Sequence, residues 1–149
     1  MKESREIPDE IVEPARTEAV PALLEFVCNH AWEAGFSDER IQGIRLAVDE
    51  AIGNIIRFAC CDGTAEIRIS CSVNDIGALS INVVDTGKPF NMLVATSFPE
   101  TQDFAKPGQP LSTRLMKKAI KNIEYRRDAD RNILIFVVSR DAGNRHKPG

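Results

Sequence analysis

The spacing of apolar residues predicts two helices in the first half of the chain. Apolar positions recur every three or four residues over 18–34 and again over 40–60, which is typical of amphipathic helices. Gly35 is suited to end the first helix, and Ser37 to cap the start of the second. The residues expected to face a core are Leu23, Leu24, Val27, Ala31 and Trp32 in the first helix and Ile41, Ile44, Val48, Ile52 and Ile55 in the second.

Alternating apolar and polar residues predict strands in the second half, with one short edge strand near the start. The expected strands are 5–12, 64–73, 78–84, 123–127 and 132–139. The second and third strands are joined by a short polar turn, and so are the fourth and fifth. Each of these pairs is therefore predicted to form an antiparallel hairpin.

A third helix and a long irregular segment complete the pattern. Residues 111–123 return to helical spacing, with Leu111, Leu115, Ala119 and Ile120 on one side. Residues 86–110 contain several prolines and glycines without periodicity, which is typical of a functional lid or a disordered loop. The order of elements predicts an α+β two-layer sandwich, with a mostly antiparallel sheet and three helices on one face.

Composition narrows the class of protein. The 149 residues predict a single domain, 1–149, and the net charge of −3 argues against a broad nucleic-acid interface. No apolar run is long enough to span a membrane and no signal segment is evident, so we expect a cytoplasmic protein. The four cysteines lack metal-ligand spacing, which disfavours zinc, and Cys28 and Cys71 are expected to be buried thiols. The polar tail, 141–149, is expected to be flexible.

An acidic and an amide residue on the second predicted helix are the first candidates for catalytic or metal-binding residues. Glu50 and Asn54 are four residues apart, so their side chains are neighbours on one helix face, opposite the apolar face. A carboxylate beside a carboxamide oxygen could bind a hard cation such as Mg²⁺, or it could place a base beside a reacting hydroxyl. An ordinary solvated helix face would have the same composition.

Two further segments could bind a nucleotide. Asp85 and Gly87 follow a predicted strand, where a carboxylate can bond an exocyclic amine while the glycine lets backbone approach a ring. The same residues would also suit a plain turn. Residues 108–115 lead into a helix N-terminus, which is a natural place for a phosphate.

In this order and spacing, the three segments resemble the GHKL ATPase superfamily, which shares the Bergerat nucleotide-binding fold. More closely, the chain resembles the anti-sigma-factor serine kinases of bacterial partner-switching systems, over nearly its whole length. The resemblance implies ATP and Mg²⁺ as cofactors, with Glu50 as general base toward a substrate serine and Asn54 as the magnesium ligand. It further implies that Asp85 recognises adenine with Gly87 as its companion, and that 86–113 is an ATP lid. The lid residues expected to bind the nucleotide are Gly108, Ser112 and Thr113.

The resemblance also implies partners. The protein would phosphorylate a serine on an anti-anti-sigma-like protein and sequester a sigma factor, without binding nucleic acid or membrane directly. Whether it forms a homodimer is left open. A sensor-kinase catalytic domain is a weaker alternative, because no phosphoacceptor-histidine helix pair precedes the domain.

Departures from the family pattern support a second hypothesis. The family lid ends in a glycine-rich run, whereas this chain has Pro110, which lacks an N–H, and Ser112, which carries a Cβ. Phe58 stands where the family often has His, and Lys88 where a second glycine is common. The alternative is therefore a degenerate, non-catalytic module of the same fold that regulates by sequestering its partner.

Overall fold

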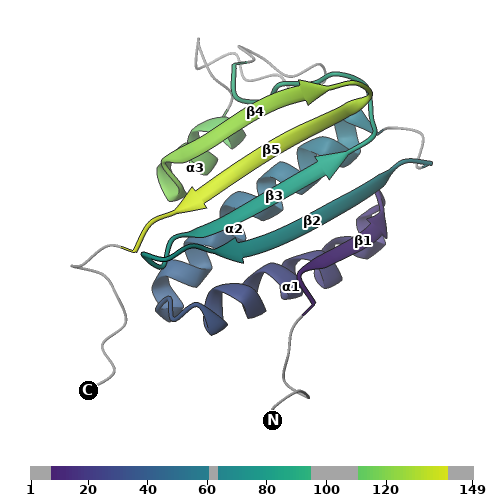
Figure 1. Ribbon diagram of the computed structural model, residues 1–149. Coiled ribbons are helices and arrows are strands. Elements are labelled where there is room, and N and C mark those ends of the chain that lie inside the picture. The colour runs from purple at the N-terminus through teal and green to yellow at the C-terminus, as the bar shows by residue number, and fades with distance from the viewer. Residues whose placement is uncertain (1–7, 61–63, 95–110, 141–149) are drawn as a thin grey trace, which may run out of the picture.

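Five strands form one antiparallel sheet in the computed structural model, which describes residues 8–60, 64–94 and 111–140. The strands are β1 (Glu10–Pro14), β2 (Glu66–Val73), β3 (Leu79–Asp85), β4 (Asn122–Asp128) and β5 (Arg131–Val138). Their order across the sheet is β1-β2-β3-β5-β4, so β1 and β4 are the edges (Figure 1). Both predicted hairpins, β2–β3 and β4–β5, are confirmed, and so is the edge position of the first strand.

The helical segments all lie on one face of this sheet, as predicted (Figure 1). They are a short 3₁₀ turn (Thr17–Ala19), α1 (Val20–Glu33), α2 (Asp38–Asn54), a π-helical turn (Ile55–Ala59) and α3 (Leu111–Ala119). At the start of α2, the Ser37 side chain accepts a hydrogen bond from the Arg40 amide, which confirms the predicted cap. Helix α2 contacts both α1 and α3, and it is therefore central in the helical layer.

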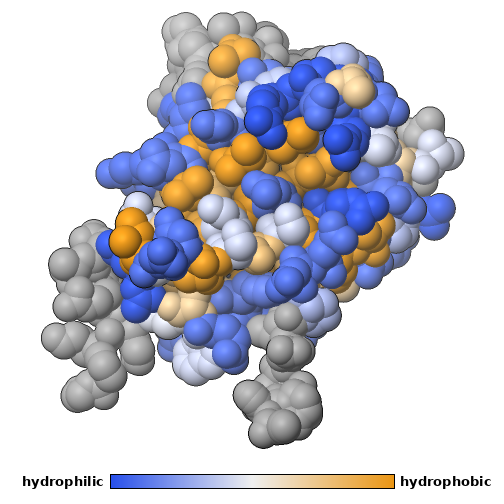
Figure 2. All heavy atoms as spheres, in the orientation of Figure 1, coloured by the Kyte–Doolittle hydropathy of each residue, from blue (hydrophilic) through white to orange (hydrophobic). Residues whose placement is uncertain are grey.

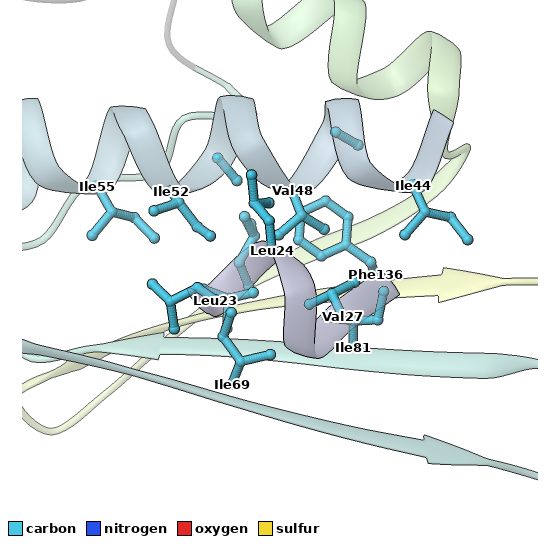
Figure 3. Packing of buried hydrophobic residues seen from close by; sticks show 14 of the residues in the cluster. Leu23, Leu24, Val27, Ile44, Val48, Ile52, Ile55, Ile69, Ile81 and Phe136 are labelled. Carbon is cyan, nitrogen blue, oxygen red and sulfur yellow. The ribbon is translucent and has the colours of Figure 1, made fainter. Parts of the chain in front are cut away.

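The core lies between the two layers (Figure 3). Apolar side chains of α1 and α2 meet those of the central strands, and all five predicted core residues of α2 and the following turn are buried. The most completely buried large side chains are Leu23, Val27, Ile44, Val48, Ile52, Ile67, Ile69, Leu79, Ile81, Val83, Met116 and Phe136. This packing fixes α2 over the sheet, and α2 carries Glu50 and Asn54.

The opposite face of the sheet carries mixed side chains. Figure 2 shows this face as mostly hydrophilic, with hydrophobic residues gathered over its middle. Because alternate residues of β3 and β5 face the helices, Val84, Ile133 and Ile135 point away from them. No helix in the described part of the chain covers this face.

Trp32 was predicted to lie in the core, and the structure shows that this is wrong. Its side chain is 61% exposed. Leu23, Val27 and Ala31, spaced four residues apart, are all buried along α1. The adjacent set, Leu24, Cys28 and Trp32, becomes steadily more exposed toward the end of the helix. For the same reason Cys28 is only half-buried, while Cys71 is buried as expected.

The buried face of α3 also differs from the prediction. Leu111 is 54% exposed, and Leu115 and Ala119 are only half-buried. The helix instead buries Thr113 and Met116, whereas Ile120, just beyond its end, is buried as predicted. The polar Thr113 can face inward because its hydroxyl donates to the Met92 carbonyl oxygen at 2.8 Å.

Other differences concern the ends of elements. The first strand is shifted to Glu10–Pro14, and α3 ends at Ala119 rather than 123. The predicted helix over 40–60 changes at Asn54 into a π-helical turn, in which the Cys60 amide donates to the Ile55 carbonyl at 2.8 Å. Within the described ranges, no helix combines the length and apolar character needed to cross a membrane.

Candidate functional site

Asp85 ends β3 as a buried carboxylate, only 1% exposed. Its Oδ1 accepts hydrogen bonds from the Gly87 amide at 2.8 Å and from Asn132 Nδ2 at 2.9 Å. The Cys60 thiol lies 3.6 Å from the same oxygen. Among the described residues every contact to this carboxylate uses Oδ1, so Oδ2 remains for a ligand that donates a hydrogen bond.

Burial dominates the electrostatics of Asp85. Loss of hydration raises the pKa of this carboxyl above its usual range, because water no longer stabilises the charged form. Hydrogen bonds from Asn132, Gly87 and Cys60, together with the charge of Arg127, lower the pKa and offset part of this effect. The surrounding donors therefore hold the carboxylate in place and partly compensate for its burial.

Gly87 allows two backbone segments to approach each other beside Asp85. A Cβ at this position would lie 2.3 Å from the carbonyl oxygen of Ala59 and 2.8 Å from the Cys60 sulfur. The next amide, of Lys88, donates to that same Ala59 carbonyl at 3.0 Å. The sequence suggested that the Gly87 backbone approaches a ligand ring. In this structure it instead approaches Ala59 and Cys60, at the end of the π-helical turn.

A pocket of about 330 Å³ opens where these segments meet. It is lined by Ala59, Cys60, Thr64, Ala65, Thr86, Gly87 and Lys88. Its lining comes from the end of the π-helical turn, from residues before β2 and from the loop after β3. Asp85 itself does not line the pocket, but Cys60 and Gly87, which contact its Oδ1, do. A carboxylate with one oxygen free of hydrogen bonds is a group that fits the exocyclic amine of an adenine base.

Glu50, Asn54 and Ser112 form a second cluster, between α2 and α3. The Ser112 hydroxyl donates to Glu50 Oε1 at 2.7 Å, and Asn54 Nδ2 donates to Ser112 Oγ at 2.9 Å. Glu50 is half-buried and Asn54 is 3% exposed. The structure thus brings together three residues predicted for the site, with a hydroxyl oxygen held between a carboxylate and an amide.

The same cluster fits a hard cation in part. Both contacts of the Asn54 side chain, to Ser112 and to the Met92 sulfur at 3.7 Å, use Nδ2, which leaves the amide oxygen as the atom that Mg²⁺ would take. No group of three or more His, Cys, Asp or Glu residues able to hold a metal occurs within the described ranges. Magnesium bound here would therefore need oxygens from the nucleotide and water as well.

The remaining lid residues are placed differently. Thr113 is fully buried and its hydroxyl is used by Met92, as described above, while Lys117 Nζ donates to the Leu93 carbonyl at 3.2 Å. These two contacts attach α3 to the segment after β3. Gly108 and Pro110, most of the predicted lid and the tail 141–149 lie outside the described residues.

Asn132 is a site residue that the sequence analysis missed. It is 4% exposed, and besides Asp85 its Nδ2 donates to the Lys88 carbonyl at 2.8 Å. Its oxygen accepts from the Tyr125 hydroxyl at 2.5 Å and from the Phe90 amide at 3.2 Å. The signal was available: alternation along β5 places Asn132 on the same face as Leu134, where a polar side chain needs partners.

Comparison with solved structures supports the architecture. The RsbU and RsbW domains of Rv1364c from Mycobacterium tuberculosis match 94% of this chain and 35% of theirs, with a TM-score of 0.61 and 12% identity. The catalytic domain of histidine kinase ThkA matches 93% of this chain over its full length, with a TM-score of 0.53 and 13% identity. The histidine kinase domain of an Erythrobacter litoralis blue-light activated kinase matches 80% of this chain, with a TM-score of 0.52 and 18% identity.

These likenesses establish the fold alone, because the identities are low. This chain spans 60% of the matched Erythrobacter litoralis domain and 31% of the longer structure of the same kinase. A comparison with curated protein sequences found no match. The family model for the histidine kinase-like ATPase domain matches residues 13–138, which include both clusters of the site. The chain therefore belongs to the histidine kinase-like ATPase domain family, whose cofactor is ATP.

Proposed function

We propose that this protein is an ATP-dependent serine kinase of the anti-sigma-factor type. It transfers phosphate to a serine on an anti-anti-sigma-like protein and sequesters a sigma factor. The family match supports nucleotide binding, and the likeness to structures that include an RsbW domain is compatible with this class. The choice of a serine as acceptor rests on the geometry around Glu50.

One observation carries the proposal: a serine hydroxyl already lies against the Glu50 carboxylate at 2.7 Å. This is the distance at which a carboxylate can accept a proton from a hydroxyl nucleophile. Asn54, one helical turn along α2, orients that hydroxyl through its amide. The site can therefore hold a serine side chain in the orientation that deprotonation requires.

ATP, when bound, supplies the transferable phosphoryl group. The residues of this chain would position the reactants: Asp85 Oδ2 would accept a hydrogen bond from the adenine, Asn54 would offer its amide oxygen to magnesium, and Glu50 would take the proton of the acceptor hydroxyl. Phosphoryl transfer depends mainly on positioning and electrostatics, so a rigid helix carrying two of these groups suits the reaction.

The test is transfer of labelled phosphate from ATP to a protein partner captured with this chain. Glu50→Gln should leave ATP affinity nearly unchanged but slow transfer by about 10²- to 10⁴-fold, because a positioned base is lost. Asp49→Asn is the matched control, since Asp49 is the exposed neighbour on α2. Equal rates in the wild type and Glu50→Gln would contradict the proposed role of Glu50.

A second candidate function has its own observation. Ser112 of the chain itself fills the position between Glu50 and Asn54. This arrangement is compatible with a non-catalytic module that sequesters its partner while its own side chain closes the site. If the partner binds but receives no phosphate from the wild type, this second function replaces the first.

A further inference from the structure

We propose that Ser112 is itself a phosphoacceptor, modified within the same chain by the kinase site against which it lies. The inference rests on the proposed function, because it uses the same base and the same phosphate donor. Ser112 is the serine whose hydroxyl contacts Glu50, at 2.7 Å, although the two residues are 62 positions apart in sequence. It opens α3, and α3 packs on α2, so the fold delivers the acceptor to the base.

The hydrogen bonds of Ser112 place its hydroxyl against a candidate base and leave one lone pair of its oxygen unused. Its proton points to Glu50 Oε1, and one lone pair of Oγ accepts from Asn54 Nδ2 at 2.9 Å. A hydroxyl oxygen has two lone pairs, so one remains to form a bond with phosphorus. The candidate base and the candidate magnesium ligand are therefore both partners of this one hydroxyl.

The reaction balances with ATP as the phosphoryl donor. A bond forms between Ser112 Oγ and the γ-phosphorus of ATP, while the bond from that phosphorus to the oxygen bridging to the β-phosphate breaks. ADP leaves with the electron pair, and the hydroxyl proton passes to Glu50. No oxidant or further reactant is required.

The product would alter the site. A phosphate on Ser112 places about two negative charges beside the Glu50 carboxylate, and like charges at contact repel. The hydroxyl that bridged Glu50 and Asn54 would also be lost as a donor. A helix N-terminus favours an anion, but we expect the repulsion from Glu50 at contact to outweigh this effect, so that phosphorylated Ser112 moves away from Glu50 and displaces the start of α3.

The experiment incubates the purified full chain with Mg²⁺ and ATP and measures intact mass, then maps the phosphate by peptide mass spectrometry. The expected result is one phosphate on Ser112, formed at a first-order rate that does not depend on protein concentration. Ser112→Ala should abolish it and Glu50→Gln should slow it by about 10²- to 10⁴-fold. The control Ser72→Ala removes an exposed serine of β2 and should be phosphorylated like the wild type.

Several results would overturn the inference. Phosphate on other serines only, a rate that rises with protein concentration, or equal phosphorylation of Glu50→Gln would each do so. If ATP binds and the partner is phosphorylated while Ser112 stays unmodified, this inference fails and the proposed function stands. If the wild type binds no ATP, both fail.

A second readout needs no nucleotide. In the absence of ATP, Ser112→Asp places a carboxylate against Glu50, whereas Ser112→Asn is neutral and of similar size. Hydrogen exchange of the α3 amides should be several-fold faster in Ser112→Asp than in Ser112→Asn, because of the repulsion. Equal exchange in the two variants would contradict the expected displacement of α3.

Discussion

At the scale of single residues, the candidate site depends on which atom of each polar side chain is already in use. The hydrogen-bond donors around Asp85 all contact its Oδ1, and the Asn54 side chain makes its hydrogen bonds through Nδ2. Each side chain therefore keeps one oxygen free for a ligand. Asn132 supports this arrangement by bonding both Asp85 and the loop after it. The sequence predicted Asp85 and Asn54 as site residues, but the atoms that remain available emerge only from the three-dimensional contacts.

Replacing Gly87 tests the close approach beside Asp85. Gly87→Ala should lower the free energy of unfolding by about 1–3 kcal/mol, because the new Cβ would overlap backbone atoms of Ala59. Gly43→Ala is the control, since a Cβ there meets nothing within 4 Å and alanine favours a helix by roughly 0.5–1 kcal/mol. Chemical denaturation measures both. A Gly87→Ala variant as stable as the wild type would contradict the described packing.

The raised pKa of Asp85 predicts a pH dependence of stability. Its carboxyl binds a proton more readily in the folded chain than in the unfolded chain, so the stability it contributes is present below the ordinary aspartate pKa and is lost as pH rises through the raised value. The free energy of unfolding of the wild type, relative to Asp85→Asn, should therefore fall over that interval. Other titrating groups cancel in the difference. A difference that rises with pH would show that the pKa of Asp85 is lowered instead.

At the scale of elements, α2 was the most predictable part of the site and α3 the least. A long run of apolar residues at helical spacing fixed which side of α2 faces the core, and hence where Glu50 and Asn54 lie. Helix α3 is short, and its orientation follows from the buried hydroxyl of Thr113 and its bond to Met92. Such a bond between distant segments leaves no periodic signal in the sequence.

Thr113→Val tests how α3 is held. Valine keeps the shape of threonine but removes the donor to the Met92 carbonyl, which leaves a buried acceptor unpaired. We expect a loss of about 1–3 kcal/mol in the free energy of unfolding and faster hydrogen exchange in α3. Thr113→Ser keeps the hydroxyl and should retain the protection of α3 amides. Unchanged exchange in Thr113→Val would mean that this bond does not anchor the helix.

At the scale of the whole molecule, the two-layer fold places Asp85 in the sheet, at the end of β3, and Glu50 and Asn54 in the helical layer, on α2. The order of elements was enough to predict the sheet, its hairpins and the single covered face, because neighbouring strands in sequence pair and the helices need one apolar surface. The exposure of Trp32 was missed because periodicity does not show how far a helix extends over a sheet. The family match supports nucleotide binding by this domain.

The central claim is that Asp85 binds the base of an adenine nucleotide, and calorimetric titration with ATP tests it most directly. Titrations with and without Mg²⁺ should show binding to the wild type, strengthened by the cation. Asp85→Asn should bind on the order of 10- to 150-fold more weakly, because a hydrogen bond to a charged group is worth roughly 1.5–3 kcal/mol. Asp75→Asn, at an exposed turn position, should bind like the wild type. Equal affinity of the wild type and Asp85→Asn for ATP would contradict the account.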